Sequence, residues 1–216
     1  MDERRKIQIL KIISLFGIIG VAFYFLHVIV GGILYEGYNP FAQAVSDLTA
    51  SNSPSRKIAS TLAFIYGIFE IVFKIGFFVY FKGKINKAIS VGSCLFLIMG
   101  LISSFGYTLF PLSEAGYAGT FQDIMHVVVT VCVVVFTVIS LIFFSIGFLK
   151  TKNCKYIGVI SICTLALLLI GALLLNVVPK TYFGVAERIN VYSVVIYTGV
   201  LSLWMYRYIK KIGTHN

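Results

Sequence analysis

Residues 125–149 of the chain read MHVVVTVCVVVFTVISLIFFSIGFL, and the stretch contains no charged residue. A transmembrane helix needs about 20 predominantly apolar residues, so this stretch is long enough to cross the hydrocarbon core of a bilayer. Its β-branched run, Val127–Val135, would favour a strand in water. In lipid, however, the backbone must satisfy its own hydrogen bonds, and a helix does so within one segment. We therefore expect a transmembrane helix here.

Stretches of the same kind recur along the whole chain. They cover residues 12–34, 57–81, 88–110, 125–149, 155–178 and 190–209. The 216 residues are 59% hydrophobic and 12% charged, whereas soluble domains average about 45–50% and about 25%. So little charge excludes a soluble enzyme, a disordered chain and a nucleic-acid-binding protein. The sequence predicts an all-α membrane protein, a six-transmembrane-helix bundle that forms one polytopic domain over residues 1–216.

The basic residues predict how the spans are oriented. Lysine and arginine accumulate on the cytoplasmic side of membrane proteins. If the N-terminus lies inside, the inner segments carry most of the basic residues behind the net charge of +10: Arg4, Arg5, Lys6, Lys11, Lys82, Lys84, Lys87, Lys150, Lys152, Lys155, Arg207, Lys210 and Lys211. We therefore expect both termini in the cytoplasm. Nucleic acid is not an expected partner, because these charges are divided among short turns. His215 is expected to be solvated.

The acidic residues and the prolines lie mainly on the opposite, outer side. The outer loops contain all four prolines and the acidic residues Glu36, Asp47, Glu114, Asp123 and Glu187. Asn39 and Pro40 fit the cap and first position of a short helix, which we expect to lie in the outer interface. Thr120 and Asp123 fit a capping box at the start of the fourth span. Because the inner turns are short and lysine-rich, a functional site is expected on the outer face.

Several short motifs follow one another in a particular order. They are Asn39-Pro40, Ser46-Asp47-Leu48, Phe110-Pro111, His126 at the start of a helix, and Glu187-Arg188 before the last span. In this order the chain resembles, over nearly its whole length, domain-of-unknown-function family 998, which comprises six-helix prokaryotic membrane proteins. Members often carry an acidic residue two positions after the Phe-Pro proline, where this chain has Ser113. The resemblance implies a multi-pass protein of the cell membrane and implies no settled activity.

The outer residues give two alternative kinds of site. Asp47, His126 and Glu187 are candidate catalytic residues of an intramembrane hydrolase or transferase that acts on lipid at the outer leaflet. Arg188, with Ser46 and Asp123, is a candidate for binding a lipid head group or a carboxylate. The structural alternatives are a helix cap for Asp123 and an interfacial ion pair for Arg188. His126 and the carboxylates could also hold a divalent metal, but this donor set specifies none.

Two charged residues, Glu70 and Lys74, lie inside the second span. Their spacing of four places them on one helix face and suits an ion pair. Charges inside a membrane usually face a bundle interior or a cavity, where they can mark a proton or ion path. The alternative, which we favour, is a mutually neutralising pair that fixes helix packing, with Lys74 extending partly toward the inner surface.

Three functions remain open from the sequence alone. The first, which we prefer, is a membrane protein without catalytic activity that binds a lipid or a partner through its outer polar cluster. The second is the hydrolase or transferase, and the third is a small transporter or channel that uses Glu70 and Lys74. The sequence contains no HExxH, GxSxG or Walker motif, which is why the first is preferred. The oligomeric state is left open.

Overall fold

The computed structural model describes residues 3–212, so His215 lies outside the described residues. It contains six long helices and two short 3₁₀ turns, which are η1 (Ser46–Thr49) and η2 (Lys180–Tyr182). The helices are α1 (Glu3–Leu34), α2 (Arg56–Phe81), α3 (Lys87–Leu109), α4 (Phe121–Leu149), α5 (Lys155–Val177) and α6 (Phe183–Ile212). All six are long and apolar enough to cross a membrane, as the sequence predicted.

The helices extend beyond the apolar ranges at several ends. The largest differences are at α1, which begins at Glu3 rather than near residue 12, and at α6, which begins at Phe183 rather than near residue 190. Hydropathy detects only the part of a helix that suits hydrocarbon, whereas backbone hydrogen bonding continues into the polar interface. The polar first turns of α6 therefore belong to the helix, and they carry Glu187 and Arg188.

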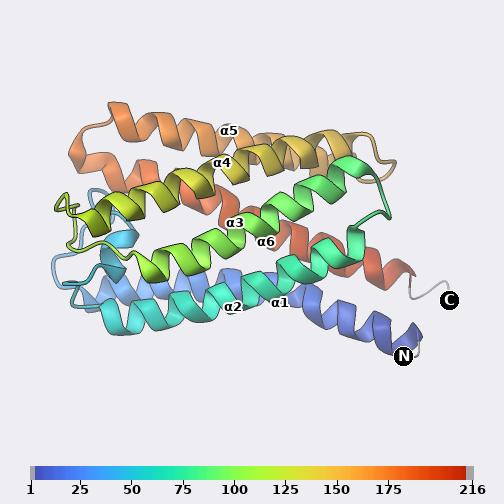
Figure 1. The fold of residues 1–216 in the computed structure, drawn as a ribbon, viewed down its shortest axis with the longest axis horizontal. Coiled ribbons are helices and arrows are strands. Elements are labelled where there is room, and N and C mark those ends of the chain that lie inside the picture. Colours follow the sequence, from blue (N-terminus) through green and yellow to red (C-terminus); the bar gives the residue numbers. More distant parts are fainter. Residues whose placement is uncertain (1–2, 213–216) are drawn as a thin grey trace.

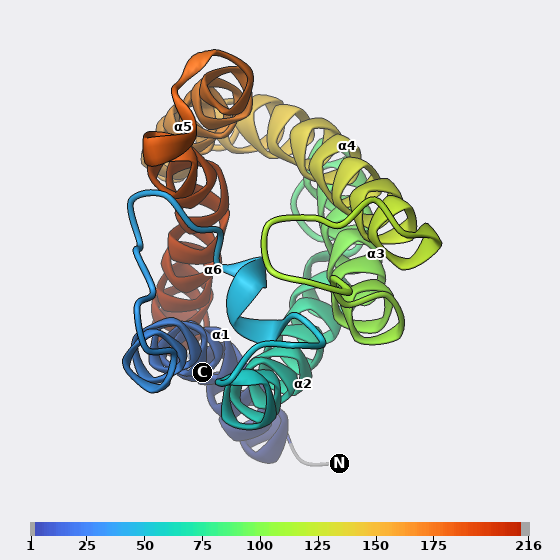
Figure 2. The same ribbon diagram turned by 90° about the vertical axis from the view of Figure 1, so that its left-hand side faces the viewer.

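The six helices form a closed ring. Each helix packs against the next along the chain, and α6 packs against α1, as the end-on view in Figure 2 shows. The start of α1, the end of α6 and the α2–α3 and α4–α5 turns lie at one end of the ring, here called the terminal end (Figure 1). The α1–α2, α3–α4 and α5–α6 loops lie at the opposite end, here called the plug end.

Close helix contacts and side-chain bonds hold the ring together. At Gly171 of α5, a Cβ atom would lie 2.5 Å from the backbone nitrogen of Asn190 on α6, so only glycine allows this approach. Small residues allow transmembrane helices to pack closely in this way. Nearby, Asn190 Nδ2 donates to the Leu168 carbonyl at 2.8 Å. At the terminal end, Asn86 caps α3 and also donates to the Gly147 carbonyl of α4 at 2.9 Å.

The interior of the ring differs between its two halves. In the half toward the terminal end, aromatic rings pack against one another around Trp204, whose ring centroid lies 4.9 Å from those of Phe81 and Phe148. This aromatic cluster comprises Phe77, Phe81, Phe144, Phe148, Trp204 and Tyr208. In the other half, rings with hydroxyl groups meet instead, and Tyr24 lies 5.1 Å from Tyr66. The interior is therefore apolar toward the termini and more polar toward the plug end.

Residues 39–50 close the ring at the plug end, and we call this segment the plug; its second half enters the ring (Figure 2). The expected helix after Asn39-Pro40 is wrong in length and place. The chain makes one turn, in which Gln43 N donates to the Asn39 carbonyl at 2.8 Å, and then forms η1. Leu48 is 0% exposed and Asp47 is 4% exposed, because the second half of the segment is buried among the helices instead of lying on the interface. Side chains of α6 satisfy its backbone groups, so no helix is required.

The cytoplasmic location of both termini stays a prediction, and two exposed loop residues can test it. Ser51 lies at the plug end and Lys152 at the terminal end. We expect Ser51→Cys to react with a membrane-impermeant maleimide on intact cells, and Lys152→Cys to react only after permeabilisation. The opposite pattern would place the termini outside. The background for both is a variant with serine in place of Cys94, Cys132, Cys154 and Cys163.

Candidate functional site

Glu187 and Arg188, which are adjacent on α6, hold different groups of the plug. Glu187 Oε2 accepts a hydrogen bond from Val45 N at 2.6 Å. Arg188 Nη1 donates to the carbonyls of Pro40 at 2.6 Å and Gln43 at 2.9 Å. Glu187 therefore accepts a hydrogen bond from a backbone N–H group, and Arg188 donates hydrogen bonds to backbone carbonyls. The interfacial ion pair expected for Arg188 is absent among residues 3–212.

The Arg188 guanidinium makes two further contacts. Its Nη2 donates to the Tyr38 hydroxyl at 2.6 Å, and Nη1 donates to the Gly184 carbonyl within α6 at 2.9 Å. Burial raises the pKa of Tyr38 to about 12, so its hydroxyl keeps a proton at neutral pH and donates it to the Ala44 carbonyl at 2.7 Å. At Gly184 a Cβ atom would lie 2.6 Å from the Pro40 carbonyl oxygen. Glycine at this position therefore allows the plug to reach α6.

Asp47 joins the plug to the α3–α4 loop. Its Oδ2 accepts from Ala44 N, and its Oδ1 accepts from Gly116 N, each at 3.0 Å. The two loops also meet through backbone atoms, since Ser51 N donates to the Leu112 carbonyl at 2.8 Å. Both carboxylate oxygens of Asp47 are thus bound to backbone N–H groups. This arrangement stabilises the loops and leaves the carboxylate little freedom to act as a base.

Asp123 caps α4, as the sequence predicted. Thr120 and Asp123 form a complete capping box. The carboxylate also accepts from Ser113, from its backbone N at 2.7 Å and its hydroxyl at 2.8 Å. Ser113 is the position where the resembled family often has an acidic residue, and an acid here would face the carboxylate of Asp123. With serine, the pair forms a donor–acceptor contact that fixes the α3–α4 loop.

His126 lies on α4 and bonds to the end of α3. Its Nδ1 donates to the Phe110 carbonyl at 2.8 Å, which leaves Nε2 as the other ring nitrogen of the neutral imidazole. The ring lies 4.9 Å from that of Tyr107. Within residues 3–212, no group of three His, Cys, Asp or Glu side chains is arranged to hold a metal ion. Catalytic roles for His126, Asp47 and Glu187 remain predictions.

Sequence reasoning missed a groove on the outside of the ring between α5 and α6. Its volume is about 440 Å³, and Arg188 contributes to its wall at the plug end. The other wall residues are almost all apolar or aromatic: Pro40, Phe41, Leu167, Val185, Ile189, Tyr192, Ser193 and Ile196. A second hollow of about 220 Å³ shares Leu167, Ser193 and Ile196 and continues toward Val200. The lining positions on α6 share one helix face, and this spacing is the sequence signal that could have indicated the groove. They are residues 185, 188, 189, 192, 193 and 196.

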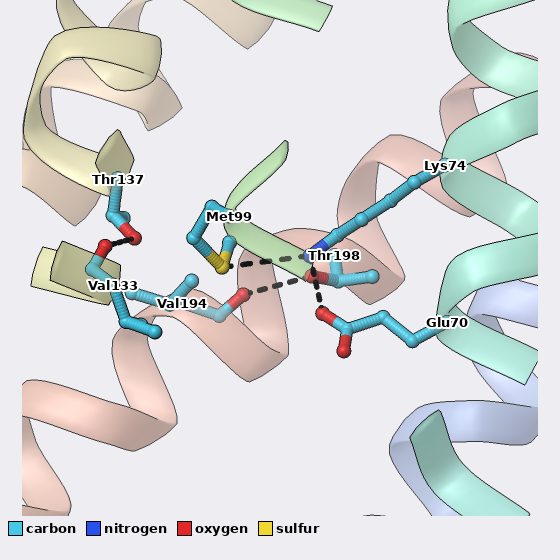
Figure 3. A network of polar contacts seen from close by, with 7 residues as sticks. All are labelled: Glu70, Lys74, Met99, Val133, Thr137, Val194 and Thr198. Atoms are coloured by element: carbon cyan, nitrogen blue, oxygen red, sulfur yellow. Dashed lines mark hydrogen bonds and ion pairs between the residues drawn. The ribbon is translucent and has the colours of Figure 1, made fainter. Parts of the chain in front are cut away.

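The charged pair of the second span faces the ring interior (Figure 3). Lys74 Nζ lies 2.5 Å from Glu70 Oε1, and the two residues are 1% and 3% exposed. Lys74 Nζ also lies 4.0 Å from the centroid of the Phe96 ring and 3.7 Å from the sulfur of Met99. The expected extension of Lys74 toward the inner surface is wrong, because its ammonium group stays with Glu70 inside the bundle. The pair is closed off from solvent.

A ring of six membrane-length helices, with a loop segment buried in one end, is the architecture of a multi-pass membrane protein. The chain belongs to the family described as "protein of unknown function (DUF998)", whose model matches residues 18–204. The resemblance derived from the ordered motifs is therefore confirmed. No curated protein and no solved structure matches the chain.

Asp47→Ala tests whether the carboxylate stabilises the loops. It leaves the buried N–H group of Ala44 without an acceptor, which costs about 1–3 kcal/mol, whereas the exposed N–H group of Gly116 can bond to water. We expect the free energy of unfolding in detergent to fall by that order. Ser46→Ala is the matched control, because within residues 3–212 the Ser46 side chain makes no hydrogen bond. Equal losses in the two variants would contradict this role.

The Glu70–Lys74 pair gives a prediction with two arms. Removing one charge, as in Lys74→Met, leaves the other buried without a counter-ion and should destabilise the protein by about 3–5 kcal/mol. The double variant Glu70→Leu/Lys74→Leu should recover most of that loss, because two apolar residues need no counter-ion. Denaturant unfolding in detergent measures both. A double variant as unstable as the single one would show that the charges do more than neutralise each other.

Proposed function

We propose that this protein is a multi-pass membrane protein that binds a lipid with an anionic head group. The observation that carries this proposal is the groove between α5 and α6, which is apolar along its length and has Arg188 at its plug end. An acyl chain suits the apolar walls, and a guanidinium suits a phosphate. The groove lies on the outside of the ring, where lipid is the natural occupant.

The charge of Arg188 supports the anionic head group. Its hydrogen-bond acceptors are carbonyls and the protonated hydroxyl of Tyr38, all of which are neutral. Its neighbour Glu187 turns its carboxylate to Val45 N instead, so the described residues give Arg188 no ion-pair partner. The positive charge at the end of the groove is therefore available to a phosphate, even though several of its N–H groups hold the plug.

The hydrolase or transferase alternative has less support. A catalytic carboxylate must reach substrate, whereas Asp47 and Glu187 already accept hydrogen bonds from backbone N–H groups. The transporter alternative needs a polar path past Glu70 and Lys74, and the aromatic cluster around Trp204 fills the next part of the ring interior. No observation favours either of these over lipid binding.

Groove-filling substitutions test the proposal without touching Arg188. Ile196 lines the groove and is 52% exposed, whereas Ile162 of α5 is 46% exposed and lies outside it. We expect Ile196→Trp to lower the amount of co-purified phosphatidylglycerol several-fold, because the indole occupies the space of the acyl chain. Ile162→Trp is the matched control and should retain the lipid. Lipid analysis of the protein purified in mild detergent measures both.

The head group is tested separately with the unmodified protein in nanodiscs. Phosphatidylglycerol should protect the protein from thermal unfolding more than phosphatidylcholine does, because only the first has a net negative charge. Equal retention of lipid by the two tryptophan variants would overturn the groove as the binding site. Equal protection by the two lipids would overturn the role of the anionic head group.

A further inference from the structure

The groove that carries the proposed lipid site continues into the second hollow, which lies farther from the plug. The two share three wall residues, among them Ile196 of α6, so they form one track along the outside of the ring. Arg188 lies at the plug end of this track. Val200 of α6 and Ile160 of α5 lie at its other end. The second hollow is therefore an extension of the groove and not a separate surface.

The walls of the second hollow present almost no polar surface. Ser193 donates its hydroxyl hydrogen to the Asn190 carbonyl at 2.7 Å, and the Tyr197 hydroxyl shares a hydrogen bond of 2.7 Å with Ser161. Thr164 is only 6% exposed. The other wall residues are Ile160, Cys163, Leu167, Ile196 and Val200. A charged head group would find no partner here, whereas hydrocarbon gains van der Waals contacts.

The length of the track matches one acyl chain within one leaflet. Arg188 and Val200 are twelve residues apart on α6, which corresponds to about 18 Å at about 1.5 Å per residue. The hydrocarbon core of a bilayer is about 30 Å thick, so one leaflet contributes about 15 Å. Val200 also lies close to the middle of α6, which runs from Phe183 to Ile212. A lipid with its phosphate at Arg188 would therefore end its chain near the bilayer midplane.

The same length favours a lipid over a transmembrane helix, whether from a partner or from a second copy of the chain. A spanning helix crosses both leaflets and would pack along both halves of α6. The walls of the track end at Ile160 and Val200. One helical turn beyond them, Ile157 and Trp204 are 1% and 4% exposed and belong to the packed core. A flexible chain that stops inside the membrane suits a track of this extent.

We propose that the lipid in the groove places one acyl chain along this track, with the chain end in the second hollow, and that the hollow selects for chain length. The inference rests on the proposed function, because it needs a lipid in the groove. It adds the leaflet, which is the one at the plug end, and the preferred chain, which reaches Val200. A chain that stops near Ile196 leaves the second hollow unfilled and loses the van der Waals contacts of its walls.

Lipid competition in mild detergent tests the selection for chain length. Delipidated protein is mixed with equal amounts of dipalmitoyl- and didecanoyl-phosphatidylglycerol, and native mass spectrometry measures the ratio of the two bound lipids. We expect the unmodified protein to bind the long-chain lipid several-fold better. Because long chains also partition more strongly into micelles, the informative quantity is the change in this ratio between variants.

Two variants fill the second hollow from opposite walls. Cys163→Trp does so from α5, at an exposed position that needs no rearrangement of the core, and Val200→Phe does so from α6. Each should lower the ratio several-fold by weakening only the long-chain lipid. Val159→Trp is the matched control, because Val159 is 51% exposed and lies one turn from Cys163 but outside the track. The control should keep the ratio of the unmodified protein, and melting temperatures check the fold of each variant.

The outcomes separate this inference from the proposed function. An unchanged ratio in both hollow-filling variants, with phosphatidylglycerol still bound, would overturn the selection for chain length and leave lipid binding in the groove intact. An equal fall of the ratio in Val159→Trp would also overturn it, because the effect would not depend on the hollow. Loss of both lipids from folded hollow-filling variants would contradict a role limited to the chain end. Binding of neither lipid by the unmodified protein would overturn the proposed function as well.

Discussion

The structure depends on one constraint, which is that backbone groups placed at membrane depth need hydrogen-bond partners from the chain itself. The six helices meet it internally, but the plug is not helical along most of its length. Two side chains of α6, far away in sequence, satisfy several of its backbone groups: Glu187 accepts from Val45, and Arg188 donates to Pro40 and Gln43. Asp47 of the plug in turn accepts from Gly116 of the α3–α4 loop. These polar residues allow a loop to close one end of an apolar ring.

The buried charged residues of the ring also need partners from the chain, and they have fewer of them. Lys74 is satisfied by Glu70, by a sulfur and by an aromatic face, whereas one oxygen of Glu70 is not satisfied at all. A pair of this kind gives less stability than an apolar pair of equal volume. Removing one member of the pair would nevertheless leave the other charge buried and unpaired, so the two residues have to be kept or replaced together.

The sequence predicts well the features that neighbouring residues determine, and it predicts poorly the features that depend on contacts between residues far apart in the chain. The six spans follow from hydropathy, and the capping box of Thr120 and Asp123 follows from a spacing of three residues. The turn at Asn39 is also local, but its failure to continue as a helix is not, because Arg188 binds the carbonyls that a helix would have used. The location of a functional site on the outer loops stays a prediction. The contacts of Glu187 and Arg188 with the plug, which join residues more than 140 apart, had no sequence signal.

The first turns of α6 connect the plug and the outer groove. Successive residues on a helix point about 100° apart, since 3.6 residues complete a turn. Glu187 therefore faces the plug inside the ring, while Arg188 reaches both the edge of the plug and the groove outside. Further along α6 the same alternation places Ile196 in the groove and Thr198 in the interior. A movement of the plug would change the contacts of Arg188, and the carbonyls it now binds would compete with a phosphate for the same donors.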